Sequence, residues 1–275
     1  MKTTEYSVLS LNMFGTPFHP KKILRTFFRN DVRKRFRAIA RVIEASNIDI
    51  LMLQEVHDFP HYYFLKKLLP QYKYISYKKM LYGPRGGLVI FSKYPLERAH
   101  YYDFIDKGSF YNKSITGYIS VKGFLSVRVQ ATNIWIINTH LTQNSDHDFS
   151  ESNRYAGLLK SQLKQIIVHL HSLQNKNDRV ILGGDFNMPK DTKFYNNFIS
   201  ESKLVDAFAQ DSFTTYHKSF LPEGASVGRV DYIFSSPSLH PIRTEYILKT
   251  SLKDNDGIDF YASDHIGLVV AYLSA

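Results

Sequence analysis

Residues 179–189 read RVILGGDFNMP, and this stretch decides the fold prediction. The apolar run at 180–182 is typical of a buried strand, and the two glycines that follow let the backbone turn tightly just before Asp185. Because side chains alternate along an extended chain, Asp185 and Asn187 share one face. We therefore expect a buried strand that delivers a carboxylate and an amide at its end.

Other apolar runs also place polar side chains where a strand starts or stops. One carboxylate after a strand is as easily a turn former or a helix cap, but the repeated placement favours a functional cluster. Burying isolated carboxylates costs several kcal/mol each unless a cation or a hydrogen-bond network compensates them. A Mg²⁺ ion would meet that need. The residues placed in this way are Glu55, His140, Asp185, Asp231 and Asp264.

The rest of the sequence predicts a mixed α/β layered fold, because helices are interspersed among many short strands. Helical spacing of apolar residues is found at 30–47, 59–69, 151–173 and 192–200. Strand patterns occupy 6–11, 48–53, 87–92, 96–104, 118–130, 134–140, 179–182, 229–235 and 266–273. No repeat, low-complexity tract or linker divides the sequence, so we expect one domain over residues 1–275.

Composition excludes some kinds of active site but does not identify the partner. The 44% hydrophobic content of the 275 residues is enough for a sizeable core. A formal net charge of +10 favours polyanions or anionic membrane surfaces as partners. The absence of cysteine excludes a disulfide framework, a thiolate metal site and a cysteine nucleophile.

Targeting signals are not evident in the sequence. Residues 1–11 lack the basic start and the apolar run of a secretory signal, and the longest apolar stretches are far below the roughly 20 residues that span a bilayer. We expect any membrane contact to be peripheral. A cytoplasmic location and export by a route without a signal peptide both stay open.

Two histidines are candidates for proton transfer or for contact with a phosphate. His265 follows Asp264, and Asp231 on another predicted strand could orient its imidazole ring. His140 ends a predicted strand and is the second candidate. The other nine histidines are interpreted as surface or hydrogen-bonded structural residues.

Taken together, six short motifs resemble the endonuclease/exonuclease/phosphatase superfamily in order and approximate spacing. They are Asn12, Gln54-Glu55-Val56, Asn138-Thr139-His140-Leu141, Gly184-Asp185-Phe186-Asn187, Asp231-Tyr232-Ile233-Phe234 and Ser263-Asp264-His265. The resemblance runs over nearly the whole chain. It implies a four-layered α/β sandwich, in which two mixed β-sheets pack face to face with helices outside and the site lies at one end of the sheets.

The resemblance also implies a role for each motif in Mg²⁺-dependent hydrolysis of a phosphate ester by in-line attack of water. On the metal side, Glu55 would be the principal ligand, with Asn12 nearby and Asp264 completing the acidic group. The implied catalytic residues are Asp185 to orient or deprotonate water, Asn187 and His140 to contact the phosphate, and Asp231 to orient His265. Whether Asp185 or His265 is the base stays open.

The expected cation follows from the ligands. Mg²⁺, with Mn²⁺ able to substitute, is preferred over Zn²⁺ because the candidate ligands are oxygen atoms. One departure from the family pattern is Phe14, which stands where some DNA-repair members carry a second acidic residue. A metal ligand typical of those nucleases is therefore missing.

Within the superfamily, the middle of the chain is most similar to the neutral sphingomyelinases. The similar segments are 86–95, 121–129 and 138–141, and the pair Lys122-Gly123 is the most discriminating. The similarity implies phospholipase C-type release of a phosphorylated headgroup, with Lys122 as a substrate-binding residue. A DNA endonuclease or phosphodiesterase is the main alternative, followed by a phosphoinositide phosphatase and an inactive scaffold.

An aromatic and basic cluster in residues 101–118 would suit either substrate. Its members are Tyr101, Tyr102, Phe104, Lys107, Phe110, Tyr111, Lys113 and Tyr118. The rings could sit at headgroup depth in a phospholipid membrane or stack on nucleobases, and Tyr111 is the predicted contact. They could equally be half-buried strand residues. We expect a monomer with no obligate protein partner.

Overall fold

The computed structural model describes residues 4–15, 29–106, 121–221, 228–254 and 256–274. Two six-stranded sheets and a two-stranded hairpin account for its strands. The first sheet has the order β11-β14-β1-β2-β4-β3, and the second has the order β5-β6-β7-β8-β10-β9. The hairpin pairs β12 (Leu252–Lys253) with β13 (Asp259–Phe260).

The first sheet comprises β1 (Thr4–Asn12), β2 (Ile50–Gln54), β3 (Tyr74–Ser76), β4 (Val89–Ser92), β11 (Pro241–Ile247) and β14 (Gly267–Ser274). The second comprises β5 (Leu96–Asp103), β6 (Gly123–Val129), β7 (Ile134–His140), β8 (Arg179–Asp185), β9 (Val205–Asp206) and β10 (Asp231–Ser235). Each sheet contains one parallel pair, β1 with β2 and β7 with β8, and its other pairs are antiparallel. Both sheets are therefore mixed, as expected.

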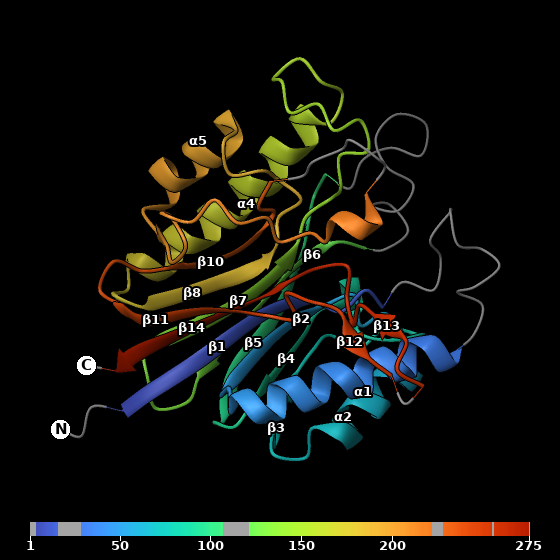
Figure 1. Cartoon of the computed structure of the whole chain (residues 1–275). Helices are drawn as coiled ribbons and strands as arrows, with labels where there is room; N and C mark the ends of the chain where they lie inside the picture. The colour runs from blue at the N-terminus through green and yellow to red at the C-terminus, as the bar shows by residue number, and fades with distance from the viewer. Residues whose placement is uncertain (1–3, 16–28, 107–120, 222–227, 255, 275) are drawn as a thin grey trace.

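Helices cover the two outer faces of the paired sheets (Figure 1). Because parallel strands need a long crossover, α1 (Arg29–Ser46) joins β1 to β2 and α4 (Ala156–Gln174) joins β7 to β8. The helix α2 (Phe59–Leu68) lies beside α1, and α5 (Lys193–Ser202) lies beside α4. None of the helices in the described ranges combines the length and apolar character needed to cross a bilayer.

Three buried clusters hold the layers together. Val8, Met52, Ile136 and Ile181 belong to the cluster between the two sheets. A second cluster joins α1 and α2 to the first sheet, and a third joins α4 and α5 to the second sheet. This arrangement of helix, sheet, sheet and helix confirms the predicted four-layered sandwich.

Several element boundaries differ from those expected. The helix predicted from residue 151 begins at Ala156, because the Asn153 side chain accepts a hydrogen bond from the Tyr155 amide at 2.8 Å and stabilises a turn instead. The strand predicted from residue 87 begins at Val89, after a short 3₁₀ turn η1 (Arg85–Gly87). Sequence reasoning did not predict β3, β9, β11, β12 or β13.

Strand directions bring the predicted site residues to one end of both sheets. The parallel strands β1, β2, β7 and β8 end there, while β10 and β14 begin there. In the second sheet Asp185 is the register partner of both His140 and Asp231. Motifs that lie far apart in the sequence therefore meet in space.

Candidate active site

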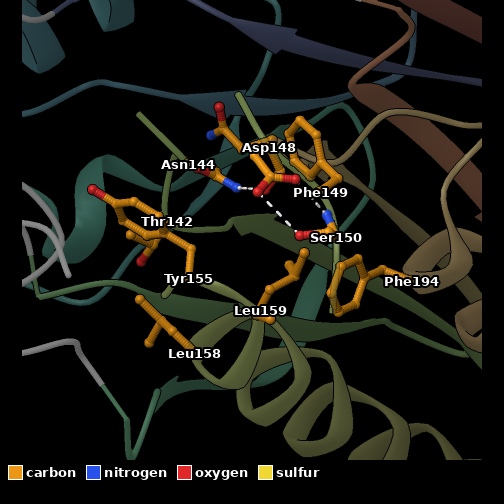
Figure 2. A pocket seen from close by; sticks show the side chains of 11 residues that line it. Thr142, Asn144, Asp148, Phe149, Ser150, Tyr155, Leu158, Leu159 and Phe194 are labelled. Atoms are coloured by element: carbon orange, nitrogen blue, oxygen red, sulfur yellow. Dashed lines mark hydrogen bonds between the residues drawn. The ribbon is translucent and has the colours of Figure 1, made fainter. Parts of the chain in front are cut away.

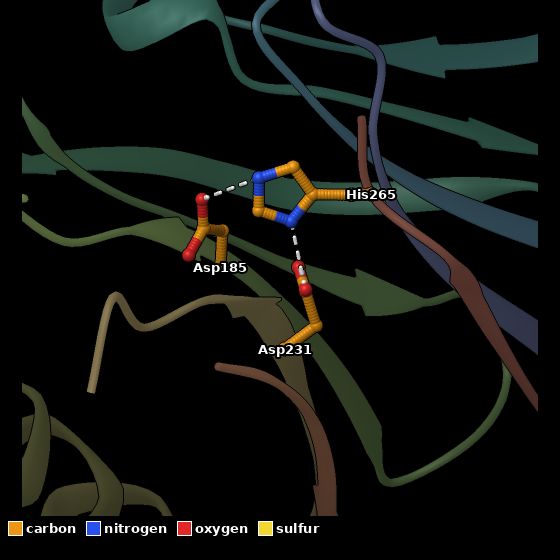
Figure 3. A group of neighbouring side chains, drawn as sticks. All are labelled: Asp185, Asp231 and His265. Atoms are coloured by element: carbon orange, nitrogen blue, oxygen red, sulfur yellow. Dashed lines mark hydrogen bonds and ion pairs between the residues drawn. The ribbon is translucent and has the colours of Figure 1, made fainter. Parts of the chain in front are cut away.

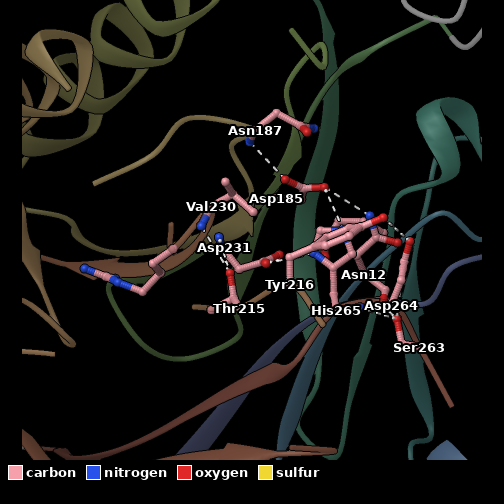
Figure 4. Close-up of polar contacts among 12 residues, drawn as sticks. Asn12, Asp185, Asn187, Thr215, Tyr216, Val230, Asp231, Ser263, Asp264 and His265 are labelled. Atoms are coloured by element: carbon pink, nitrogen blue, oxygen red, sulfur yellow. Dashed lines mark hydrogen bonds and ion pairs between the residues drawn. The ribbon is translucent and has the colours of Figure 1, made fainter. Parts of the chain in front are cut away.

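Asp185 is at the centre of the polar cluster at this end of the sheets (Figure 4). Its Oδ2 atom accepts a hydrogen bond from Nδ2 of Asn12 at 3.1 Å and lies 3.4 Å from Nε2 of His140 and 3.7 Å from Nε2 of His265. The Asn12 amide nitrogen also donates to Glu55 Oε1 at 3.2 Å. The structure thus gathers groups from both sheets around one buried carboxylate.

Strained backbone turns aim two of these side chains. Glu55 and Asn187 both have a left-handed backbone, with φ of 60° and 48°, which costs non-glycine residues roughly 1–3 kcal/mol. Just before Asp185, Gly184 has φ of 155°, and a Cβ there would lie 2.0 Å from the Thr139 carbonyl oxygen. Such turns are typical of sites in which side-chain direction matters more than local stability.

Asp231 and His265 form a hydrogen-bonded pair between the two sheets (Figure 3). Nδ1 of His265 lies 2.8 Å from Oδ2 of Asp231, and both side chains are buried. Burial by itself would lower the pKa of His265, but the carboxylates of Asp231, Asp185 and Asp264 raise it well above its ordinary value. With Nδ1 facing Asp231, the other ring nitrogen of His265, Nε2, faces Asp185.

The carboxylates nearby are difficult to ionise together. Burial raises the pKa of Asp185 to about 6, opposed by His265 and reinforced by Asp231. Burial also raises the pKa of Asp264 to about 6, opposed by His265 and reinforced by Glu55. Crowded carboxylates in a low-dielectric site favour either a shared proton or a bound cation.

Two groups of side chains are candidates for holding a divalent cation. Ligand atoms of Asp185, Asp231 and His265 all lie within 4.8 Å of one another. However, His265 would offer a nitrogen ligand, whereas Mg²⁺ prefers oxygen, and its Nδ1 atom already faces Asp231 at 2.8 Å. The carboxylates of Glu55 and Asp264 offer oxygen ligands without this conflict, so their chemistry fits a hard cation such as Mg²⁺.

Asn12 lies where the sequence predicted it, but it presents its nitrogen to the cluster. Its Oδ1 atom accepts a hydrogen bond from the Phe14 amide at 3.0 Å, while its Nδ2 atom bridges Glu55 and Asp185. An amide nitrogen does not bind Mg²⁺. In this arrangement the Asn12 nitrogen bridges the Glu55 and Asp185 carboxylates and holds them next to each other.

Asn187 and Lys122 converge on the carbonyl oxygen of Leu141. Nδ2 of Asn187 donates to it at 3.1 Å and Nζ of Lys122 at 2.6 Å. Burial lowers the pKa of Lys122 to about 8, although Asp185 and Glu55 oppose this shift. Lys122 therefore brings a positive charge into the site, next to an amide that could contact the same anionic group.

His140 belongs to the site as a neutral ring. Burial lowers its pKa well below the ordinary value, and the Lys122 charge adds to this effect. His57, which was interpreted as structural, is half-buried near Glu55, and a Cβ at Gly87 would lie 2.8 Å from the His57 ring. Both neutral imidazoles are therefore part of the polar cluster.

Tyr216 is a residue of the site that sequence reasoning missed. Its hydroxyl group donates to Asp264 Oδ2 at 3.1 Å, and its ring stands edge-on to the His265 ring with centroids 4.9 Å apart. An isolated β-bridge also pairs Tyr216 with His265. The sequence around Tyr216 has no periodic pattern, and its only local signal is the β-branched pair Thr214-Thr215 before it.

The structure decides between the two interpretations of the 101–118 cluster for Tyr101 and Phe104. Tyr101 and Phe104 are buried in the protein core, so neither ring is free to reach a membrane or a nucleobase. The Tyr101 hydroxyl group donates to the Val121 carbonyl oxygen at 2.8 Å. Both residues are strand-associated core residues because β5 packs on β6 at this point. Tyr111, with the other cluster members from 107 to 118, lies outside the described residues.

A small pocket adjoins the site next to Asn187 (Figure 2). It mixes aromatic and polar walls, and Asp148 on its rim accepts hydrogen bonds from the backbone and hydroxyl groups of Ser150. Its lining residues are Thr142, Asn144, Asp148, Phe149, Ser150, Tyr155, Ala156, Leu158, Leu159, Asn187 and Phe194. The segment that follows His140 therefore forms a wall beside the polar cluster.

Comparison with known proteins agrees with the fold. The model of the Endonuclease/Exonuclease/phosphatase family matches residues 9–265. A Drosophila melanogaster protein named "Putative neutral sphingomyelinase" is 25% identical over 248 residues, which are 85% of this chain and 52% of the fly protein. The chain thus spans about half the length of the curated relatives it matches.

Solved structures share the same architecture. Sphingomyelinase C from Streptomyces griseocarneus superposes with a TM-score of 0.71 at 19% identity, covering 98% of this chain and 99% of that one. A truncated Caenorhabditis elegans protein named TDP2 gives a TM-score of 0.68 at 19% identity, covering 98% of each chain. At such low identity these structures show the common fold only.

Proposed function

The chain belongs to the endonuclease/exonuclease/phosphatase family, and we propose that it is a Mg²⁺-dependent phosphodiesterase that hydrolyses its substrate by in-line attack of water. The observation that carries this proposal is the convergence on Asp185 of Asn12, His140 and His265, with the Asp231 pair behind His265. This arrangement offers an acceptor for a proton, a donor of a proton and carboxylates for a cation in one place.

Glu55 and Asp264 are the residues that would hold the cation. When bound, Mg²⁺ or Mn²⁺ would supply positive charge that neutralises the phosphoryl oxygens. Asn12 holds the carboxylates of Glu55 and Asp185 next to each other through its two hydrogen bonds. Tyr216 holds Asp264 in place by donating a hydrogen bond to its Oδ2 atom at 3.1 Å.

Asp185 is the better candidate for the base. Its pKa of about 6 lets its carboxylate accept a proton from water near neutral pH, whereas the surrounding carboxylates raise the pKa of His265 and favour its protonated form. Asp231 orients the His265 ring, so that Nε2 can donate a hydrogen bond to the charge that develops on the phosphoryl group or on the leaving oxygen. The two groups then have opposite roles because their environments move their pKa values apart.

Contacts to the phosphate come from the second sheet and its loops. Nε2 of His140 lies 3.4 Å from Asp185. Both Asn187 and Lys122 donate to the Leu141 carbonyl oxygen. Two neutral donors and one buried cation suit an anionic group that must be held while water attacks it. We assign these three residues to substrate binding.

For the substrate, we favour a sphingomyelinase-type reaction that releases a phosphorylated headgroup from a lipid. The name of the fly relative supports this choice, as does Lys122 of the Lys122-Gly123 pair, which lies within the site. The catalytic unit would be a monomer acting at a phospholipid surface. A nucleic acid phosphodiesterase is the second candidate, because the net charge of +10 suits a polyanionic substrate equally well.

One assay separates these candidates. The protein is incubated with Mg²⁺ and, side by side, with sphingomyelin vesicles, lysophospholipids, plasmid DNA and an abasic duplex. Release of choline phosphate without cleavage of DNA is the expected result. Cleavage of DNA without release of choline phosphate would reject the lipid substrate, and unchanged turnover in excess chelator would reject the metal.

A further inference from the structure

Residues 59–85 form a basic and aromatic surface segment that the active site does not use. Six of its residues are Lys or Arg and none is Asp or Glu. At its tip, the side chains of Leu81 and Tyr82 are 80% and 76% exposed. The exposed lysines Lys78 and Lys79 directly precede this tip, whereas Lys66, Lys67 and Lys73 are exposed farther away, at the end of α2 and before β3.

The tip is held in a defined conformation. The Met80 amide donates to the Gly83 carbonyl oxygen at 2.9 Å, and the Arg85 amide donates to the Lys78 carbonyl oxygen at 2.7 Å. These bonds close a tight turn that places Leu81 and Tyr82 outward. Two adjacent large apolar side chains that a closed turn holds outward form a candidate contact surface.

The turn lies beside the active site. Gly83 packs so closely that a Cβ there would lie 2.2 Å from the His57 carbonyl oxygen, two residues after Glu55. On its other side, Nη2 of Arg85 pairs with Asp103 at the end of β5, 2.6 Å away. Ile105, which is 88% exposed, follows two residues later. The protruding apolar side chains thus stand at the same end of the sheets as the catalytic groups.

The charge of this surface points to one kind of partner. Two nearby carboxylates already have partners: Asp58 accepts a hydrogen bond from the His61 amide at 2.7 Å, and Asp103 pairs with Arg85. Lys79 lies 5.8 Å from the centroid of the Phe59 ring, and its flexible stem can extend toward an anion. Lysines around an apolar tip match a bilayer, in which lipid phosphates surround a hydrocarbon interior. A nucleic acid backbone offers Leu81 no comparable apolar environment.

We propose that Leu81 and Tyr82, with Lys78 and Lys79, dock the protein on an anionic phospholipid bilayer and turn the active site toward it. The leucine enters the acyl boundary, the tyrosine ring lies at headgroup depth, and the lysine ammonium groups contact lipid phosphates. The inference rests on the proposed lipid substrate for its biological purpose. Its binding test is independent of catalysis.

The test compares two double variants with two matched controls. Leu81→Ser/Tyr82→Ser removes the apolar tip, and Lys78→Glu/Lys79→Glu reverses its charge. The controls, Val205→Ser/Ile242→Ser and Lys176→Glu/Lys203→Glu, make the same kinds of change at exposed positions near the opposite end of the sheets. Binding is measured by cosedimentation with phosphatidylcholine vesicles, with and without phosphatidylserine, in the presence of chelator.

Both tip variants should bind the phosphatidylserine vesicles about tenfold more weakly than the parent, while both controls bind like the parent. Hydrolysis of a soluble phosphodiester should be unchanged in all four. Equal vesicle binding by tip and control variants would overturn the proposal. Binding to duplex DNA is measured as well, and the proposal is also overturned if Lys78→Glu/Lys79→Glu loses DNA binding and retains vesicle binding. A parent that hydrolyses no phosphodiester would reject the proposed function while leaving this comparison intact.

Discussion

The two sheets contribute different chemistry to the same site, although each is built around one parallel pair joined by a helix. The first sheet supplies Glu55 and Asp264, carboxylates suited to a cation. The second supplies His140, Asp185 and Asp231, which are register partners at one end of its strands. His265 stands before a strand of the first sheet and hydrogen-bonds to Asp231 of the second. The comparison shows that the catalytic arrangement exists only when the sheets are packed together.

The difference between the sheets is electrostatic. In the second sheet, Asp185 and Asp231 face the two ring nitrogens of His265 and raise its pKa. On the first sheet, the neighbouring Glu55 carboxylate adds to the rise in the pKa of Asp264. We infer that a proton on His265 offsets the charge of Asp185 and Asp231, and that a bound cation offsets the charge of Glu55 and Asp264. Variants that remove one side at a time test this division.

The largest effect is expected for Asp185→Asn, because Asp185 contacts groups from both sheets. Loss of its carboxylate removes the proposed base, and kcat for a soluble phosphodiester should fall by about 10³-fold. Thermal unfolding of the variant checks that the fold survives. A fall of only a few-fold in a folded variant would mean that another group accepts the proton.

A somewhat smaller loss is expected for Asp231→Asn, which changes only the second sheet. The amide can still hydrogen-bond to His265, but it no longer stabilises the charge on the imidazole, so kcat should fall about 10²-fold. The Mg²⁺ concentration for half-maximal activity should stay the same. A large increase in that concentration would show that Asp231 binds the metal.

Tyr216→Phe tests the first sheet with a smaller change. The variant keeps the ring against His265 and removes only the hydroxyl group that donates to Asp264 at 3.1 Å. We expect kcat/KM to fall about 3–10-fold, since one hydrogen bond to a charged group contributes roughly 1.5–3 kcal/mol at most. The Mg²⁺ requirement should rise. Activity and Mg²⁺ requirement both equal to those of the parent would argue against a positioning role.

The smallest effect on activity is expected at His169, which packs behind the second sheet. Its ring contacts Tyr102 and Phe124, and burial lowers its pKa to about 4. The unfolded chain therefore takes up a proton that the folded chain refuses, and stability falls as the pH decreases from about 6.5 toward 4. The unfolding free energy of the parent should decrease when the pH is lowered from 7 to 5. In His169→Gln the same pH change should cause a decrease that is smaller by about 1–2 kcal/mol. Chemical denaturation of parent and variant at both pH values measures this difference.

Much of the architecture follows from local sequence patterns. Apolar runs that end at polar residues located β1, β2, β7, β8 and β14 because those strands are buried on both faces and carry a strong signal. In contrast, β11 begins at a proline and is largely exposed, so its residues show no apolar run. Local patterns also could not show which aromatic residues of β5 face the core, so the position of Tyr101 stayed open until the structure showed it buried.

The site was predictable to the extent that its residues form short motifs. Tyr216 was missed because it is 48 residues away from Asp264 in the sequence, and only the path of the loop that carries Tyr216 brings the two side chains together. The direction of the Asn12 amide was likewise outside the reach of sequence patterns, because its partners Glu55 and Asp185 come from separate motifs. Motifs identify the residue types, whereas packing decides which atom of each side chain faces the site.

Direct Mn²⁺ binding tests the division between the sheets most clearly. The dissociation constant is measured by electron paramagnetic resonance, without substrate, for the parent, Glu55→Gln and Asp231→Asn. The account predicts that Glu55→Gln weakens binding about 10-fold or more, while Asp231→Asn binds like the parent. If Asp231→Asn weakens binding as strongly and Glu55→Gln leaves it unchanged, the cation belongs to Asp185, Asp231 and His265, and the proposed division is wrong.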